Sequence, residues 1–184
     1  MTTRLFGFAG GDAGRWQVLS MNTLAGEPLA TARAIDVLEG DTCQTQARRW
    51  VLRGITSNER YVTREEKENL VAKQQGLGRP QSTCAAMIPL RKSVDWWALT
   101  QDERRKIFED QSRHIAIGMN YLPAIARRLH HCRDLGPDEP FDFITWFEFA
   151  EADMAAFDEM LKALRASPEW QYVDREMDIR LRLA

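Results

Sequence analysis

The order of hydrophobic periods in the second half of the chain is the feature that most constrains its fold. Residues 84–93, CAAMIPLRKS, form an apolar run of strand length. Residues 94–114 are predicted to be mostly helical, with Thr100 and Glu103 at capping-box spacing. Residues 124–136 are ambiguous between helix and strand, and we favour a strand. The segment FDFITWFEF (141–149) alternates as a strand does, and its phenylalanines are expected on one face.

The last forty residues add one more helix and one more strand. A buried helical stripe is predicted from the spacing of Met154, Phe157, Met160, Leu161 and Leu164. The final segment, QYVDREMDIRLRLA, puts apolar residues on one face and charged residues on the other. The resulting order is strand, helix, strand, strand, helix, strand, which is the split βαββαβ pattern of a ferredoxin-like sandwich.

The first half is predicted to be a shortened version of the same unit. Short apolar runs alternate with glycine-rich turns up to about residue 45, and RRWVLRGIT (48–56) is a further strand candidate. A helix should follow, because Thr63 and Glu66 have capping-box spacing, and Gly76 is a plausible stop. The fold class is therefore α+β.

Composition excludes several classes of function. The 184 residues suggest one domain or two small packed units, and a net charge of −2 does not favour binding to nucleic acid or to a membrane. Three scattered cysteines (Cys43, Cys84 and Cys132) make a structural zinc site or a disulfide framework unlikely candidates. With no apolar run long enough to span a bilayer, we expect a soluble cytoplasmic protein.

All three histidines lie between residues 113 and 131, in a segment without a carboxylate. His114 lies at the end of the predicted helix, where a histidine with an ordinary hydrogen bond is the default and an axial ligand of a haem iron is the alternative. His130 and His131 are neighbours on a predicted strand, so they should point to opposite faces and cannot both bind one metal. We expect those two to be structural or surface residues.

Other candidate residues stay undecided on sequence pattern alone. Arg127 and Arg128 lie in an apolar setting, and only one of them can face inward on a strand; the other is expected in solvent. The remaining candidates have ordinary structural explanations, as core aromatics or surface positions: Tyr61, Trp96, Trp97 and Glu169, the last at the start of the final strand.

Taken together, the segments resemble the chlorite dismutase family of haem proteins, and most closely its short, dimer-forming branch. The resemblance rests on an ordered set of segments: GLGR (76–79), IPLRKSVDWWALTQDERRKIFEDQSRHI, YLPAIARRLHHCRDLG, FDFITWFE and EWQYV. It implies an α+β barrel of two ferredoxin-like halves. These are a shortened N-terminal half (residues 1–80) and a C-terminal half (residues 81–184) that binds haem b. It also implies a homodimer.

The resemblance assigns roles around the iron. The proximal ligand of the family falls on His114, and the carboxylate that accepts a hydrogen bond from that histidine falls on Glu169. The distal arginine falls on Arg127. The glutamine that holds this arginine falls on Gln74, with Gln75 as a neighbouring alternative.

The resemblance also covers the edge of the haem. Trp96 and Tyr61 match positions that hydrogen-bond the haem propionates, and Trp97 matches an aromatic residue that packs near the proximal side.

The implied reaction converts chlorite to chloride and dioxygen, by way of a ferryl and hypochlorite pair. Arg127 argues against the related coproheme decarboxylases, in which the distal position is typically not arginine. A haem sensor or carrier without turnover and a haem-free barrel that binds a small molecule or a partner remain as alternatives.

Overall fold

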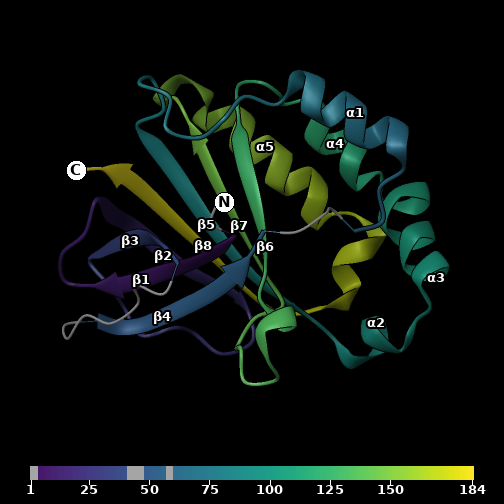
Figure 1. Cartoon of the computed structure of the whole chain (residues 1–184), viewed down its shortest axis with the longest axis horizontal. Helices are drawn as coiled ribbons and strands as arrows, with labels where there is room; N and C mark the ends of the chain where they lie inside the picture. The colour runs from purple at the N-terminus through teal and green to yellow at the C-terminus, as the bar shows by residue number, and fades with distance from the viewer. Residues whose placement is uncertain (1–3, 41–47, 57–59) are drawn as a thin grey trace.

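The strands of the chain close into an eight-stranded antiparallel barrel (Figure 1). The computed structural model describes residues 4–40, 48–56 and 60–184; Cys43 lies outside these ranges. The strands are β1 (Leu5–Gly11), β2 (Trp16–Ala25), β3 (Ala34–Glu39), β4 (Arg48–Ile55), β5 (Cys84–Lys92), β6 (Ala126–His131), β7 (Phe143–Phe149) and β8 (Val173–Leu183). Their order around the barrel is β1-β3-β2-β8-β5-β7-β6-β4.

The helices follow the predicted order in the second half of the chain. The α-helices are α1 (Arg64–Lys73), α2 (Val94–Ala98), α3 (Gln101–Arg105), α4 (His114–Met119) and α5 (Met154–Arg165). A π-helix, η1 (Lys106–Gln111), links α3 to α4, and three short 3-10 segments complete the set: η2 (Arg133–Leu135), η3 (Glu151–Asp153) and η4 (Pro168–Tyr172). The predicted capping box of Thr63 and Glu66 begins α1, and that of Thr100 and Glu103 begins α3.

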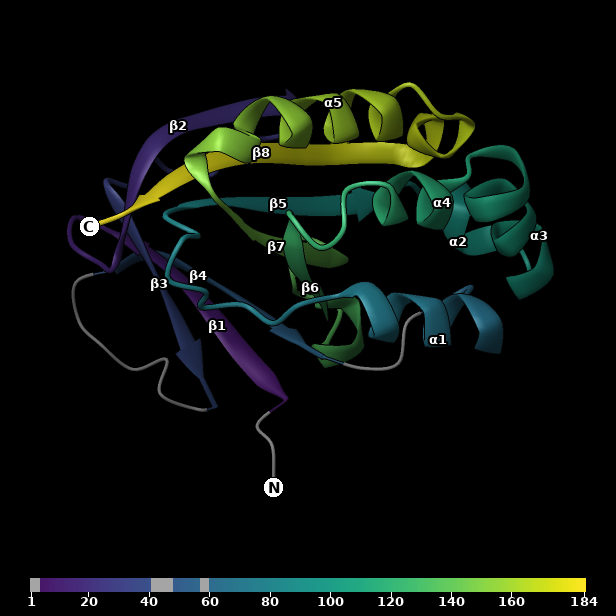
Figure 2. The same cartoon turned by 90° about the horizontal axis from the view of Figure 1, so that it is seen from above.

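The barrel consists of two sets of four consecutive strands with the same internal order. In β1–β4 the order is fourth, first, third, second, and β5–β8 repeat that order in the same direction around the barrel. The sets join where β2 pairs with β8 and β4 pairs with β6. The described helices lie beside the β5–β8 set (Figure 2). Any site between helices and sheet therefore lies over the β5–β8 set.

The chain has an apolar core on each face of the β5–β8 set. Residues such as Met87, Trp146 and Ile179 fill the interior of the barrel. Residues such as Ile88 and Phe147 lie on the outer face, where they pack with α5. The alternation along each strand produces this division, because successive side chains point to opposite faces.

The structure corrects several local predictions. The helix predicted over 94–114 is broken into separate segments, and His114 begins α4 instead of ending a helix. Arg113, between η1 and α4, adopts a left-handed conformation (φ 52°), which interrupts the helix just before His114. Glu169 lies in η4 and is buried, although a surface position at the start of the last strand was expected.

Two smaller predictions also differ. Helix α1 ends at Lys73, with Gln74 as its extended C-cap, so Gly76 is not its stop. Phe141 precedes β7 and packs in the barrel interior, whereas Phe147 and Phe149 lie on the outer face under α5. Within the described ranges, we find no helix with the length and apolarity needed to cross a membrane.

Candidate active site

A cavity of about 300 Å³ lies between the outer face of the β5–β8 set and the helices. Its floor comes from alternate residues of β5, β6 and β7, such as Leu90, Leu129 and Thr145, and its walls come from α1, α4 and α5. A volume of this size is typical of small-molecule sites. Six of the seven predicted site residues line it, namely Tyr61, Gln74, Trp96, His114, Arg127 and Glu169.

His114 is the first residue of α4, and a buried carboxylate fixes its ring. Its Nδ1 lies 2.7 Å from Oε2 of Glu169, and the ring of Phe108 stacks on the imidazole with 4.3 Å between centroids. Because Nδ1 faces an acceptor, it carries the proton, which leaves Nε2 as the nitrogen with a free lone pair. This is the arrangement of a histidine that ligates a metal through Nε2.

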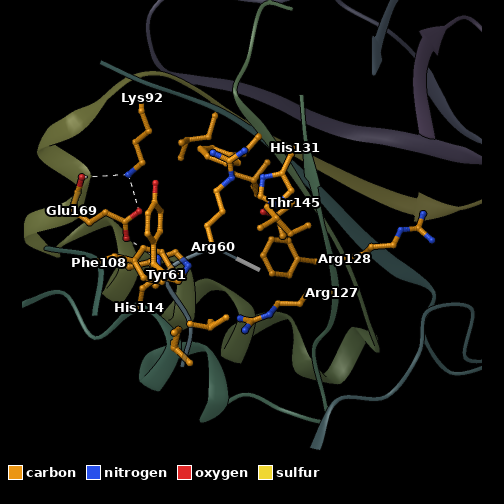
Figure 3. A pocket seen from close by; sticks show the side chains of 18 of the residues that line it. Arg60, Tyr61, Lys92, Phe108, His114, Arg127, Arg128, His131, Thr145 and Glu169 are labelled. Carbon is orange, nitrogen blue, oxygen red and sulfur yellow. Dashed lines mark hydrogen bonds and ion pairs between the residues drawn. The ribbon is translucent and has the colours of Figure 1, made fainter. Parts of the chain in front are cut away.

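Glu169 also binds a lysine that sequence reasoning missed. Nζ of Lys92 lies 2.7 Å from Oε1 of Glu169 (Figure 3), and both side chains are only 4% exposed. The signal was present in the sequence, because Lys92 ends an apolar strand and shares the face of Ile88 and Leu90. A lysine on the buried face of a strand requires an anionic partner.

The electrostatics of this network keep Glu169 ionised. Burial acts to raise the pKa of the Glu169 carboxyl, but its interactions with His114 and with the Lys92 ammonium, including a hydrogen bond from each, outweigh it and lower that pKa to about 2. Burial in turn lowers the pKa of Lys92, and Glu169 opposes that shift. Glu169 therefore acts as a permanent anion behind His114.

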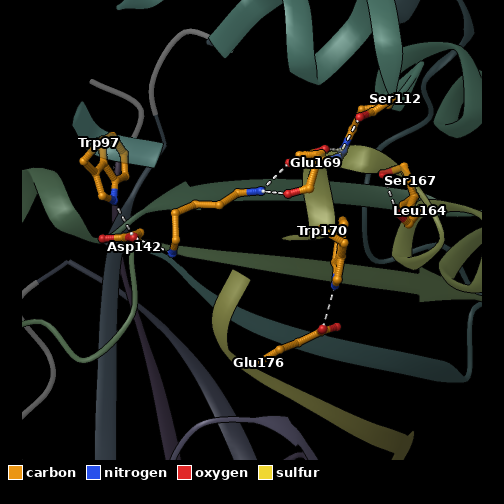
Figure 4. A network of polar contacts seen from close by, with 10 residues as sticks. Trp97, Ser112, Asp142, Leu164, Ser167, Glu169, Trp170 and Glu176 are labelled. Atoms are coloured by element: carbon orange, nitrogen blue, oxygen red, sulfur yellow. Dashed lines mark hydrogen bonds and ion pairs between the residues drawn. The ribbon is translucent and has the colours of Figure 1, made fainter. Parts of the chain in front are cut away.

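Backbone hydrogen bonds hold both partners of this pair in place. The carboxylate of Glu109 accepts from the backbone N–H of Ile115 (2.6 Å) and of Ala116 (3.3 Å), so it caps the first turn of α4. On the other side, the backbone N–H of Glu169 donates to Oγ of the buried Ser112 at 2.8 Å (Figure 4). The imidazole and the carboxylate are thus positioned from η1.

Two aromatic side chains have buried polar atoms without a hydrogen-bond partner among the described residues. The hydroxyl of Tyr61 and Nε1 of Trp96 are buried, and neither meets a hydrogen-bond partner among the residues that the structure describes. Their rings contact each other edge to face, with centroids 5.9 Å apart. Buried donors without a partner are costly, so a pair of them in one cavity indicates that a ligand with acceptor oxygens completes the site.

The local backbone explains how Tyr61 reaches the cavity. Its φ is 65°, a left-handed conformation that is uncommon for a residue with a large side chain. The guanidinium of Arg105 donates to the carbonyl oxygen of Tyr61 and forms an ion pair with Glu66 at 2.6 Å. Arg105 therefore ties the Tyr61 backbone to the first turn of α1.

Arg127 enters the cavity from β6, on the other side from Glu169, His114 and Tyr61 (Figure 3). The alternation of β6 settles which arginine faces the cavity, because Arg127, Leu129 and His131 share one face. Gln74 lies at the C-cap of α1, and its Nε2 donates to the backbone carbonyl of Arg127 at 2.9 Å. Gln75 instead accepts from Arg79 at 3.1 Å, so Gln74 is the glutamine that contacts Arg127.

Arg128 is partly buried, which corrects the prediction that it lies in solvent, and the two adjacent histidines are structural and not surface residues. The Arg128 side chain points away from Arg127 (Figure 3), its Nε donates to Nε2 of His130 at 3.0 Å, and its guanidinium lies 3.8 Å above the Phe6 ring. His130 and His131 point to opposite faces as predicted, but both are buried. Burial lowers the pKa of His130 to about 3, so its ring is neutral.

Trp97 is the one predicted site residue that the structure does not bring to the cavity. Its Nε1 donates to Oδ2 of Asp142 at 3.0 Å, and its ring stacks on Phe143. The same Asp142 oxygen accepts from the backbone N–H of Lys92 at 2.8 Å. Trp97 therefore supports the end of β5 from outside the cavity.

The charges around the cavity favour an anionic occupant. Three cationic side chains line it (Arg60, Lys92 and Arg127), while the guanidinium of Arg128 is directed away, over Phe6. Among the described residues that line the cavity, Glu169 carries the only carboxylate. Lys92 is neutralised by Glu169, and Arg60 forms an ion pair with Asp134. The described residues contain no cluster of three or more His, Cys, Asp or Glu that would hold a bare metal ion.

Comparison with known proteins was consistent at every level. The chlorite dismutase family model matches residues 24–181. A curated chlorite dismutase of Ideonella dechloratans is 32% identical over 121 residues, which cover 65% of this chain and 40% of that relative. The chain thus aligns with less than half of the length of that curated relative.

Solved structures extend the likeness to the whole chain. A dimeric chlorite dismutase from Nitrobacter winogradskyi is 51% identical, with a TM-score of 0.91 over 97% of this chain and 99% of that one. A chlorite dismutase from Candidatus Nitrospira defluvii, in complex with imidazole, is 17% identical, with a TM-score of 0.72 over 100% of this chain and 93% of that one. The second likeness is one of fold alone.

Proposed function

The chain belongs to the chlorite dismutase family, and from this premise we propose that it is a haem b-dependent enzyme that converts chlorite to chloride and dioxygen. The observation that carries the proposal is a single cavity with three features. It has a histidine whose Nδ1 is held by a buried carboxylate, two buried donors without a partner among the described residues, and an arginine that enters from the opposite side.

The residues of the cavity fit haem. His114 would bind the iron through Nε2, while Glu169 accepts its Nδ1 proton and strengthens the imidazole as a donor. The hydroxyl of Tyr61 and Nε1 of Trp96 would donate to the propionate carboxylates, which are acceptors of the kind that these atoms lack. The apolar floor of Leu90, Leu129 and Phe147 suits the macrocycle.

Arg127 is proposed to act on the substrate. Bound haem supplies the oxygen-atom transfer chemistry at iron. The Arg127 guanidinium stays cationic at any working pH, so it would attract the chlorite anion and would hold an anionic chlorine oxide, such as hypochlorite, within the cavity. The overall change, chlorite to chloride and O2, needs no external oxidant or reductant. Gln74 keeps the Arg127 backbone in place through its carbonyl.

Glu169 and Lys92 are proposed to set the strength of the iron ligand. A fully ionised carboxylate pulls on the Nδ1 proton of His114 and gives the ring partial imidazolate character, which stabilises oxidised iron. Lys92 binds the other oxygen of Glu169, so the carboxylate is held in the orientation that places Oε2 against His114.

The assembly and the division into halves are also proposals. We infer a homodimer, supported by the 51% identity to a dimeric relative. We infer two ferredoxin-like halves, residues 1–80 and 81–184, supported by the repeated order of β1–β4 and β5–β8. The haem would belong to the second half, whose strands form the cavity floor.

The test is oxygen release by the haem-loaded protein. Chlorite should yield close to one O2 per chlorite at an oxygen electrode. Arg127→Ala should keep the haem but lose activity faster during turnover, because hypochlorite escapes and oxidises the protein. Arg128→Ala is the matched control, since its guanidinium lies over Phe6 and points away from Arg127.

Three results would contradict parts of this proposal. Equal lifetimes of the Arg127→Ala and unaltered proteins at the same chlorite concentration would remove the proposed role of Arg127. Haem binding without oxygen release would leave the family assignment and remove the reaction, and coproheme with peroxide would be the next substrate tried. Failure to bind haem would remove the cofactor assignment itself.

A further inference from the structure

We propose that Gly118 is a positioning residue that fixes the guanidinium of Arg127 against helix α4. The contact between Gly118 and Arg127 is a feature of this chain. Only the role of Arg127 toward the substrate rests on the proposed function. The proposal assigns to Gly118 the task of holding the charged end of Arg127, whereas Gln74 holds its backbone.

The first observation is the closeness of the two residues. A methyl group built on Gly118 would overlap Nη1 of Arg127, and would lie 3.1 Å from Cζ and 3.3 Å from Nη2. The whole guanidinium therefore lies on the bare Cα of Gly118. Both residues are at least half-buried, so the guanidinium cannot be treated as a freely moving surface group.

The second observation is that the backbone does not require glycine at this position. Gly118 lies within α4 (His114–Met119), it is not among the residues of positive φ, and the C-cap is Asn120. Glycine is less favourable than alanine inside a helix. The remaining physical reason for a glycine at position 118 is therefore the space that the Arg127 guanidinium occupies.

The third observation is the place of Gly118 relative to His114. Residues four apart lie on the same face of a helix, so one turn of α4 separates the proposed iron ligand from the surface that Arg127 contacts. Glu109 caps that same turn through Ile115 and Ala116. The helix therefore sets the position of the arginine relative to the ligand with little freedom.

Geometry predicts what a side chain at position 118 would do. To reach van der Waals distance from an added methyl group, the guanidinium must move by roughly 1 Å or more. Charge-assisted hydrogen bonds act over a narrow range of distance, so a displacement of this size would lose the one that Arg127 makes to an iron-bound anion.

The experiment is a double-mutant cycle on fluoride binding to the ferric haem-loaded protein, followed by its absorption spectrum. Arg127→Ala should weaken fluoride binding about tenfold, the loss expected for one charge-assisted hydrogen bond. Gly118→Ala should weaken it several-fold in the unaltered protein, and should have no further effect in the Arg127→Ala protein. Gly136→Ala is the matched control, because nothing lies within 4 Å of its added methyl group.

A second readout needs no haem. In the Arg127→Ala protein, Gly118→Ala should raise the melting temperature by a few degrees, because alanine favours the helix and nothing opposes its methyl group. In the unaltered protein the same substitution should lower the melting temperature. If Gly118→Ala alone does not fold, the double variant should fold as well as Arg127→Ala.

The outcomes separate this inference from the proposed function. Equal effects of Gly118→Ala on fluoride binding in both backgrounds, or fluoride binding that is unchanged or tighter, would overturn the role of Gly118. A double variant that fails to fold would also overturn it. Coupling between the two substitutions without oxygen release from chlorite would remove the proposed reaction and leave the Gly118 contact in place.

Discussion

Replacing Lys92 by methionine tests whether the buried ion pair with Glu169 governs the stability of the site. Methionine keeps the apolar stem of the side chain and removes the ammonium group. Glu169 would then hold a negative charge at 4% exposure, with only His114 as its partner. The ammonium also lies 4.6 Å from the centre of the Trp96 ring, and that contact is lost as well.

The expected magnitude follows from burial. Removing one partner of a buried ion pair costs about 3–5 kcal/mol, mainly because the remaining charge stays uncompensated. The adjacent residue gives a matched comparison: Arg91 pairs with Asp174 at 2.8 Å, but those side chains are 44% and 41% exposed. An exposed pair contributes about 0–1 kcal/mol, since solvent screens it, so Arg91→Met should change little.

The assay is urea unfolding of the haem-free protein at pH 7 and one protein concentration, so that dimerisation does not enter the comparison. Glu169→Gln alone should also destabilise the fold, because it leaves Lys92 buried without an anion. The double variant Lys92→Met/Glu169→Gln should cost less than the sum of the two, because neither charge is then left alone.

Two results would refute this reasoning. A difference of less than about 1 kcal/mol between the losses of stability in Lys92→Met and Arg91→Met would mean that burial does not strengthen the pair. Strict additivity of Lys92→Met and Glu169→Gln would mean that the two residues act independently, despite the 2.7 Å contact.

Two further predictions concern groups outside the ion pair. Burial lowers the pKa of His130 in the folded chain to about 3, so between about pH 6.5 and pH 3 the unfolded chain binds a proton that the folded chain does not. The contribution of His130 to the unfolding free energy should therefore fall by about 1.4 kcal/mol per pH unit as the pH drops. In His130→Phe the unfolding free energy, measured by urea unfolding at pH 7 and pH 5, should depend less on pH. An identical slope in both proteins would exclude this role of His130. Glu109→Ala should remove the cap of α4 at a cost of about 1 kcal/mol and should weaken haem binding by His114, measured by haem titration. Glu109→Gln should retain part of the stability and part of the haem affinity, because it keeps one acceptor oxygen. Equal losses in the two variants would show that the acceptor oxygens do not matter.

Local sequence determined the elements of this protein and their order. The capping boxes at Thr63 and Thr100 marked two helix starts, because such a motif is satisfied within four residues. The alternation of the final strand placed Met177, Ile179 and Leu181 on the inner face of the barrel. Resemblance to a family added the roles of the site residues, and six of them meet in one cavity.

Tertiary structure decided which residue of each local pair takes part in the site. Arg127 and Arg128 are equivalent in the sequence pattern, and the pairing of β6 with β7 directs Arg127 to the cavity. Trp96 and Trp97 are likewise neighbours, yet only Trp96 lines it. A local pattern gives the alternation of side chains but not its phase, which depends on strands and helices that are distant along the chain.

The polar network of the site is the part that the sequence pattern could not contain. Lys92 meets Glu169 across 77 positions, and His114 meets Glu169 across 55. Gly118 is unremarkable in a sequence and acquires a role only where β6 lays Arg127 on α4. Burial and charge compensation arise when separate elements pack, so they belong to the folded chain and to no segment alone.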